Sequence, residues 1–182
     1  MYTEYQPSHL LVPYIDNYWE FKGNPDYGMR IHILPDGCTD FIFTLGEVAN
    51  AVEEGSLIMQ PYRVGPMTKY SELVTYTESI HMFGVRFLPC GLSCFTNLPL
   101  HEFVNSRVST NEMKAVFDDT FIEKLGEQKH VTDRIRVVEE YLLAYLARHY
   151  QPADSHVAMA VNMINHSKGK RSVRSLMDDV CL

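Results

Sequence analysis

Alternating apolar and polar residues run through the first half of the chain and predict short β-strands there. In the segment 29–34, Ile31 and Ile33 share one face, while Arg30 and His32 share the other. A period of two residues is typical of a strand, because successive side chains point to opposite sides of a sheet. We therefore expect this segment to be a strand with one polar face.

The segment 39–46 repeats the pattern, with Phe41 and Phe43 on one face and Asp40 and Thr44 on the other. The intervening residues, Pro35-Asp36-Gly37-Cys38, are typical of a turn, because proline presets φ and glycine accepts a positive φ. The two segments are therefore predicted to pair as a hairpin.

Three more segments of β character follow, broken by glycine and proline, at 56–65, 69–78 and 79–87. Before them, residues 14–21 are compatible with a short helix or a strand. Many short strands separated by turn residues favour a β-barrel or jelly roll over alternating β-α units. The expected unit spans about residues 1–90.

After Gly91 the apolar period becomes helical. One or two short helices are expected in 91–105, a helix in 110–126, and a longer helix in 132–150. The longer helix carries an apolar stripe at steps of three and four residues, formed by Ile135, Val138, Leu142, Tyr145 and Leu146. This stripe has two interpretations, a cover for the barrel or a homodimer face.

Proline at position 152 ends the long helix and predicts a domain boundary near residue 150. We expect a domain over 1–150, with a β-barrel over about 1–90 and helices over 91–150. A linker and a second helical unit would occupy 151–182, with helices at 156–166 and from Val173 onward. The predicted fold class is α+β, a cupin-like β-barrel or jelly roll followed by helices.

The net charge of −7 argues against a general nucleic-acid binder. Residues 1–150 contain 12 Lys and Arg against 20 Asp and Glu, whereas residues 151–182 contain 4 against 3. No apolar run reaches the roughly 18 residues of a membrane span, and no signal peptide is visible. The four cysteines lack the spacing of a disulfide framework. We expect a cytoplasmic protein that does not bind membranes.

The sequence offers little support for catalysis. The eight histidines include no H-x-H, H-x-x-x-H or H-E-x-x-H spacing, and neither a nucleophile elbow nor a phosphate loop is found. A metal site from His32, Cys38 and His81 is conceivable, but hydrogen-bonded polar residues on strands are the favoured interpretation. We expect no enzyme activity, no catalytic residue, no cofactor and no metal.

The polar strand faces are the natural place for a small-molecule site. Arg30, His32 and Asp40 would project into the barrel lumen, and Trp19 would supply an aromatic wall. Arg86 would pair either with an anionic ligand or with an internal carboxylate, Asp36 or Asp40, and the internal pairing is favoured. The candidate effector-binding residues are Trp19, Arg30, His32, Asp40 and Arg86.

Four segments in order resemble the sensor domain that precedes AraC-type helix-turn-helix domains in bacterial regulators. They are LVPYIDNYWEF, RIHILPDGCTDFIFTLG, YRVGPMT and FGVRFLPCGLSCFTNLPLHEFVN, covering roughly residues 5–107. Residues 156–182 resemble the first helix of the DNA-binding domain and the start of its second. In that comparison Ser172 caps the second helix, Val173 and Leu176 pack on the first, and Met177 replaces the usual alanine.

The resemblance implies a cupin-like barrel that receives a small-molecule effector or mediates dimerisation. It implies a homodimer and contact with DNA in the full-length protein, through recognition helices in the major groove. We expect these 182 residues to end before the recognition helices, so DNA-binding residues are unknown and no specific DNA binding is expected of them. The alternative is a stand-alone cupin-like small-molecule or metal-binding protein or enzyme.

Overall fold

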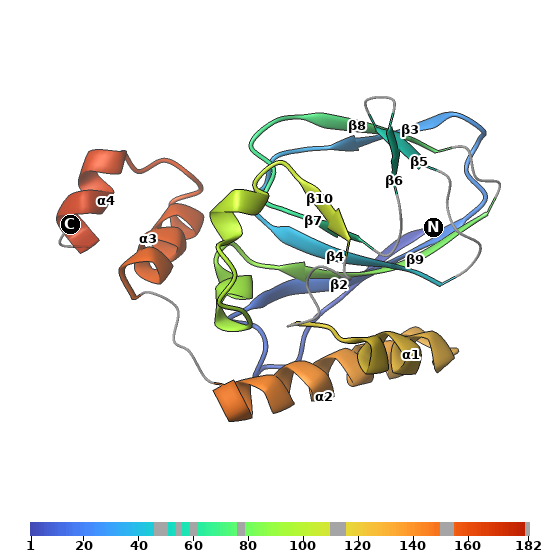
Figure 1. Cartoon of the computed structure of the whole chain (residues 1–182). Helices are drawn as coiled ribbons and strands as arrows, with labels where there is room; N and C mark the ends of the chain where they lie inside the picture. The colour runs from blue at the N-terminus through green and yellow to red at the C-terminus, as the bar shows by residue number, and fades with distance from the viewer. Residues whose placement is uncertain are drawn as a thin grey trace.

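The computed structural model describes residues 1–45, 51–53, 56–58, 62–75, 79–109, 116–149 and 155–180. These residues form two antiparallel β-sheets and a set of helices, so the α+β class is confirmed (Figure 1). Within the described part of the chain, none of the helices is both long enough and apolar enough to cross a membrane.

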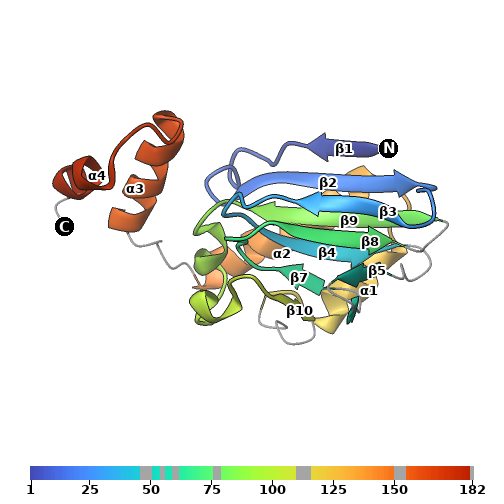
Figure 2. The same ribbon diagram turned by 90° about the horizontal axis from the view of Figure 1, so that it is seen from above.

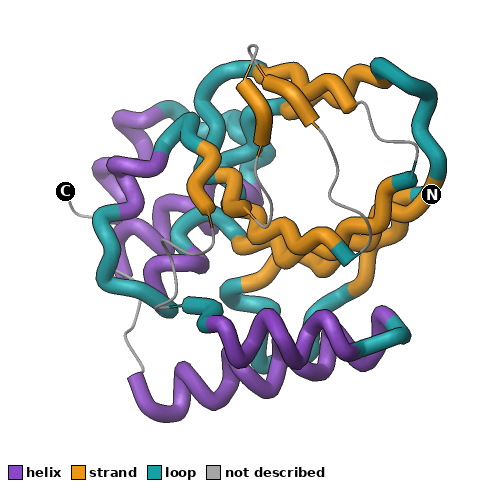
Figure 3. Tube along the Cα trace, turned by 45° about the vertical axis from the view of Figure 1, so that its right-hand side comes forward, coloured by secondary structure: helices purple, strands orange, loops and turns teal. Residues whose placement is uncertain are grey.

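The larger sheet has the strand order β1-β2-β9-β4-β7-β10, and the smaller has the order β3-β8-β5-β6. The two sheets face each other, as the tube view shows (Figure 3). The strands are β1 (Tyr2–Tyr5), β2 (Ile15–Gly23), β3 (Met29–Ile33), β4 (Thr39–Thr44), β5 (Ala51–Glu53), β6 (Ser56–Ile58), β7 (Tyr62–Val64), β8 (Ser71–Thr75), β9 (Ile80–Phe87) and β10 (Arg107–Ser109).

The outer face of the larger sheet packs on α1 (Asp119–Glu127) and α2 (Val131–His149). Alternate residues of the central strands supply this core, which is mainly aromatic: Tyr18, Phe41, Phe43, Phe83, Val85 and Phe87. Helix α2 contributes Val138 and Leu142, which are 0% and 1% exposed. Burial of this apolar surface is the main stabilising contribution to the fold.

This packing corrects one of the two interpretations of the α2 stripe. Val138 and Leu142 are fully enclosed within the chain, so they do not form a homodimer face. The other three residues, Ile135, Tyr145 and Leu146, are half-buried against the same core. The stripe covers the sheet because an amphipathic helix buries its apolar side against the nearest apolar surface.

The predicted hairpin of residues 29–34 and 39–46 is wrong, although both segments are strands. β3 pairs with β8 in the smaller sheet, while β4 pairs with β9 and β7 in the larger one. The turn between them, with Gly37 at φ +75°, carries the chain from one sheet to the other. A turn sequence predicts a change of direction, but it does not determine which strands pair.

The helical region follows the predicted order with shifted bounds. Two short 3-10 helices, η1 (Gly91–Cys94) and η2 (Leu100–Phe103), occupy the segment expected to hold short helices. The helix expected over 110–126 begins at Asp119 instead, and residues 110–115 lie outside the described residues. β10 was not predicted, because three residues are too few to establish a period.

Asp118 caps α1, since its Oδ1 accepts a hydrogen bond from the backbone N–H of Phe121 at 2.8 Å. Hydrogen bonds from Tyr141 and Phe121 hold the pKa of Asp118 below its ordinary value. We expect Asp118→Ala to lower the free energy of unfolding by about 1–2 kcal/mol, measured by urea denaturation. Thr120→Ala, on an exposed residue in the same turn, is the control; equal losses in both variants would contradict the capping role.

Helices α3 (Ser155–His166) and α4 (Val173–Val180) lie to one side of the sheets (Figure 2). The turn between them contains Lys168 and Gly169 at φ +53° and +71°. The predicted cap of α4 is confirmed, because Ser172 Oγ accepts from the backbone N–H of Ser175 at 3.2 Å. The predicted boundary near residue 150 falls in 150–154, outside the described residues.

The predicted packing of α4 is only partly correct. Leu176 is buried, but Val173 is 73% exposed and does not pack on α3. Val180, seven residues later on the same face, is 2% exposed instead. Val173 is the first residue of α4, and the buried residues of the helix, Leu176 and Val180, come later in it.

Candidate functional site

A cavity of about 500 Å³ lies between the inner face of the larger sheet and β3. Pockets of this size are typical of sites for small organic molecules. The described residues that line it come from both sheets and from the segments beside them: Tyr2, Trp19, Ile31, His32, Ile33, Leu34, Asp36, Cys38, Asp40, Ile42, Gly65, Met67, Met82, Arg86 and Arg107.

A row of polar residues crosses the inner face of the larger sheet. Arg86 on β9 lies directly opposite Asn17 on β2 and Asp40 on β4. Arg107 on β10 and Asp40 both oppose Val64 of β7, so Arg107 belongs to the same row. Residues that oppose one another in an antiparallel sheet share a face, which brings these groups together from distant parts of the sequence.

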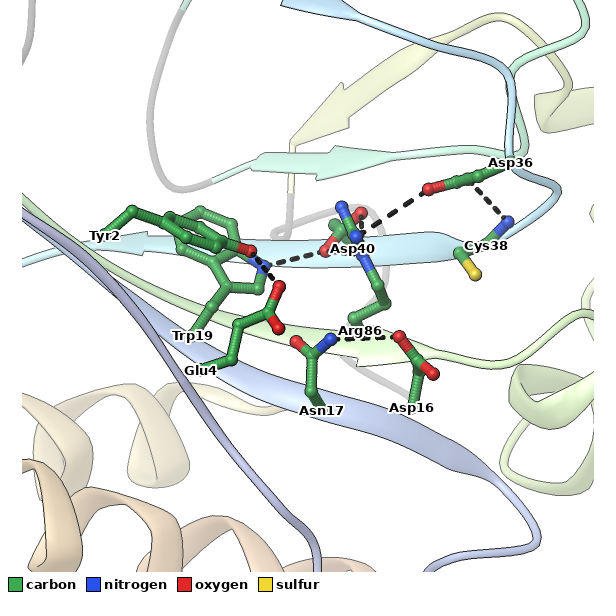
Figure 4. A network of polar contacts seen from close by, with 9 residues as sticks. All are labelled: Tyr2, Glu4, Asp16, Asn17, Trp19, Asp36, Cys38, Asp40 and Arg86. Carbon is green, nitrogen blue, oxygen red and sulfur yellow. Dashed lines mark hydrogen bonds and ion pairs between the residues drawn. The ribbon is translucent and has the colours of Figure 1, made fainter.

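Asp40 is the centre of the hydrogen-bond network (Figure 4). Its Oδ1 accepts from the indole Nε1–H of Trp19 at 2.8 Å, and Arg86 Nε donates to Oδ1 and Oδ2 at 3.1 and 3.2 Å. Asp36 approaches from the β3–β4 turn, with its Oδ2 3.7 Å from Arg86 Nη1. The network holds both the guanidinium and the indole in fixed positions.

The Asp40–Arg86 pair lies in an enclosed place, and burial and the contacts within the pair act in opposite directions on its pKa values. Burial raises the pKa of Asp40, an effect that the contacts with Arg86 and Trp19 oppose. Burial lowers the pKa of Arg86, but its contacts with Asp40 and Asp36 outweigh this and raise it above the ordinary value. Arg86 is therefore a permanent positive charge on the cavity wall.

The outermost strand, β1, contributes an aromatic side wall. The ring of Tyr2 lies 5.9 Å from the Trp19 ring, centroid to centroid, and its hydroxyl donates to Glu4 Oε1 at 3.1 Å. Burial raises the pKa of Tyr2 to about 12, so its hydroxyl is neutral at physiological pH. Figure 4 places Tyr2 and Trp19 on the same side of Asp40.

Cys38 lines the cavity as a thiol. Burial and the nearby Asp36 carboxylate raise its pKa to about 12. Because the thiolate is the nucleophilic form, this environment does not activate Cys38 for attack on a substrate. The Cys38 backbone N–H donates to Asp36 Oδ1 at 2.9 Å, which fixes the turn.

Four of the five candidate effector-binding residues, Trp19, His32, Asp40 and Arg86, line the cavity. The expected internal pairing of Arg86 is present. Arg30 lies elsewhere, with its side chain 68% exposed and bonded to Glu72 at 2.8 Å. The prediction that the polar face of this strand points inward is wrong.

Ile31 and Ile33 face inward instead, where they pack on the cluster around Trp19. The His32 side chain is 57% exposed, and its Nδ1 lies 2.5 Å from the Tyr70 hydroxyl. The apolar face of β3 turns inward because the opposite sheet presents the apolar side chains of Trp19, Ile42 and Met82.

The conceivable metal ligands do not meet. His81 Nε2 lies 2.8 Å from Glu20 Oε1, and Arg134 of α2 also contacts Glu20. These contacts place His81 on the helix side of the sheet, away from His32 and Cys38. Among the residues that the structure describes, no group of three His, Cys, Asp or Glu side chains could hold a metal ion.

Several lining residues were not predicted from the sequence, notably Tyr2, Met67, Met82 and Arg107. Met82 could have been predicted from the sequence. It is next to Phe83 on a strand buried on both faces, so the two side chains point to opposite sides of the sheet. Arg107 could not have been predicted in this way, because the three residues of β10 are too few to show an alternation of apolar and polar positions. Its position depends on the pairing of β10 with β7.

A second hollow separates α3 from the body of the sheets. Val12, Pro13 and Tyr14 line one side together with the Leu88–Gly91 turn and Cys94, and four residues of α3 line the other: Ala158, Val161, Asn162 and Asn165. The Leu88–Gly91 turn also lies close to the β3–β4 turn, whose residues Asp36 and Cys38 line the first cavity. A Cβ added to Gly37 would lie 3.5 Å from the Pro89 side chain. The Leu88–Gly91 turn thus lies between the β3–β4 turn and α3.

A family model described as a domain of unknown function (DUF6597) matches residues 3–109. No curated protein and no solved structure matches the chain. The matched range runs from β1 to the end of β10, so it spans both sheets and the cavity and excludes α1–α4.

Proposed function

The chain belongs to the DUF6597 family, and from that premise we propose that it is the effector-sensing part of an AraC-type transcriptional regulator. The two facing sheets around a cavity support a cupin-like barrel for the sensor. The order of the four sequence segments along residues 5–107, which resembles that of AraC-type sensor domains, also supports the proposal. The matched family range covers almost the same residues.

The observation that carries the proposal is the partly buried Asp40–Arg86 pair on the cavity wall. A buried ion pair contributes little net stability, because removing two charges from water costs about as much as their attraction returns. Perturbed charged groups of this kind gather at functional sites. A charged pair beside a cavity of about 500 Å³ therefore supports ligand recognition rather than a scaffold role.

Helices α3 and α4 support the regulatory part of the proposal. They form a helix–turn–helix pair, with Ser172 as the cap of the second helix. Lys168, Lys170 and Arg174 are exposed at or beside the turn, which suits contact with the phosphate backbone of DNA. We include homodimerisation in the proposal, through a surface other than the buried stripe of α2.

The test is a thermal-shift screen of sugars, organic acids and aromatic compounds, followed by hydrogen exchange with any compound that stabilises the protein. We expect a bound compound to change exchange in the cavity strands and also in α3, across the Leu88–Gly91 turn. Ile42→Trp, which places bulk in the cavity, should abolish both changes.

A response confined to the cavity strands would favour the alternative, a stand-alone binding protein. Stoichiometric zinc, iron or manganese in the purified protein would favour the metal-dependent form of that alternative. Failure of every compound to bind would remove the sensing proposal.

A further inference from the structure

The cavity wall is mostly apolar. Ile31 and Ile33 from β3 face Ile42, Met82 and the Trp19 ring from the larger sheet. A ligand body without charge or many hydroxyl groups would bury its apolar surface favourably against this wall. The wall thus favours an aromatic or branched aliphatic body.

The charged end of the cavity has a definite donor geometry. Arg86 uses its Nε–H to bind Asp40 from the side. Within the described ranges, its terminal nitrogens make no hydrogen bond, and Asp36 Oδ2 lies 3.7 Å from Nη1, beyond hydrogen-bond distance. The outer edge of a guanidinium is a planar pair of donors that matches a carboxylate.

The Asp40 carboxylate favours a ligand with a single negative charge. In the polar row of the inner face, Asp40 lies directly opposite Arg86, next to the place where a ligand would meet the guanidinium. Asp36 contributes less to the interior field, because its side chain is 44% exposed and therefore screened by solvent. A phosphate with two charges would approach Asp40 at a repulsive cost.

We infer that the cavity binds a hydrophobic monocarboxylate, with its carboxylate on Arg86 and Arg107 and its body against Trp19 and the isoleucines. This inference rests on the proposed sensing function and names the chemical class of the effector. In this arrangement Asp40 is a positioning residue, since it orients Arg86 without touching the ligand.

Isothermal titration calorimetry of the whole chain tests the charge requirement. The probes are phenylacetate and 4-methylpentanoate, compared with phenylacetamide, phenethylamine and phenyl phosphate. We expect binding of the two carboxylates to exceed that of the amide by at least about tenfold, because the amide loses the charge-assisted bonds. Equal binding of phenylacetate and phenylacetamide would overturn the inference.

Three variants locate the site. Arg86→Gln and Arg107→Gln should each weaken phenylacetate binding by roughly tenfold or more, whereas Arg30→Gln should not change it. Arg30 is the matched control because it is an arginine of the same molecule outside the cavity. Arg107→Gln keeps the Asp40–Arg86 pair, so it remains informative where the Arg86 variant folds poorly.

The outcomes separate the two proposals. A neutral or cationic compound that binds the wild type and loses binding in Ile42→Trp overturns the carboxylate inference and leaves the sensing function standing. Unchanged phenylacetate affinity in both Arg86→Gln and Arg107→Gln also overturns the inference. Absence of binding by every probe and every screened compound overturns both proposals.

Discussion

Gly84→Ala is expected to lower the free energy of unfolding by about 3 kcal/mol. A Cβ at this position would lie 1.9 Å from Cε2 of the Trp19 ring, well inside contact distance. β9 pairs with β2 on one side and β4 on the other, so its backbone cannot withdraw without disturbing two strand ladders. The indole would have to move, which would also break its hydrogen bond to Asp40.

Urea denaturation followed by circular dichroism measures the effect. The matched control is Gly126→Ala in α1, where an added Cβ meets no atom within 4 Å. In a helix, alanine is preferred over glycine, so the control should be neutral or more stable by up to about 1 kcal/mol. Equal free energies of unfolding for the two variants would contradict this prediction. They would mean that the Trp19 ring can move away from a Cβ at position 84 without loss of stability.

Arg86→Met is expected to destabilise the protein by about 3–5 kcal/mol near pH 7, because it leaves the buried Asp40 carboxylate without its guanidinium partner. In the wild-type protein, Arg86 opposes the rise that burial causes in the pKa of Asp40. Without Arg86, that pKa rises further in the folded state.

The direction of the pH dependence follows from this raised pKa. Between the ordinary carboxyl pKa and the raised folded value, folded Arg86→Met holds a proton that the unfolded chain has released, so its stability falls as the pH rises. The deficit relative to wild type should therefore be smaller near pH 5 than near pH 7, measured by urea denaturation. The double variant Arg86→Met/Asp40→Asn should recover part of the loss; no recovery would show that lost packing of Arg86, not the unpaired charge, is responsible.

The sequence allowed most of the elements to be predicted, because their periods are local. Six segments between 14 and 87 were assigned strand character or were compatible with it, and α2 differs from its expected range by one residue at each end. Strand pairing could not be derived in this way. β3 meets β8, some 40 residues later, because the long apolar face of the larger sheet needs a second sheet to cover it.

The candidate site was predicted in part for the same reason. Asp40 was found because it stands on a segment with alternating apolar and polar residues, and Arg86 because an arginine on a mostly apolar strand needs an anionic partner. Alternation defines two faces of a strand but does not say which face turns inward, and this is why Arg30 was assigned to the lumen. On β4 both faces are buried, Phe41 against the helices and Ile42 against the cavity, so polarity alone could not separate them.

The position of Trp19 makes the cavity directly observable. Trp19 is the single tryptophan of the chain, and it lines the cavity with its N–H held by Asp40. Its intrinsic fluorescence therefore arises from one place only. A compound that enters beside the indole will displace water and alter the field from Arg86, so the emission maximum and quantum yield will report occupancy without any label. The fluorescence of the unlabelled protein thus provides a direct binding assay for any compound tested against the cavity.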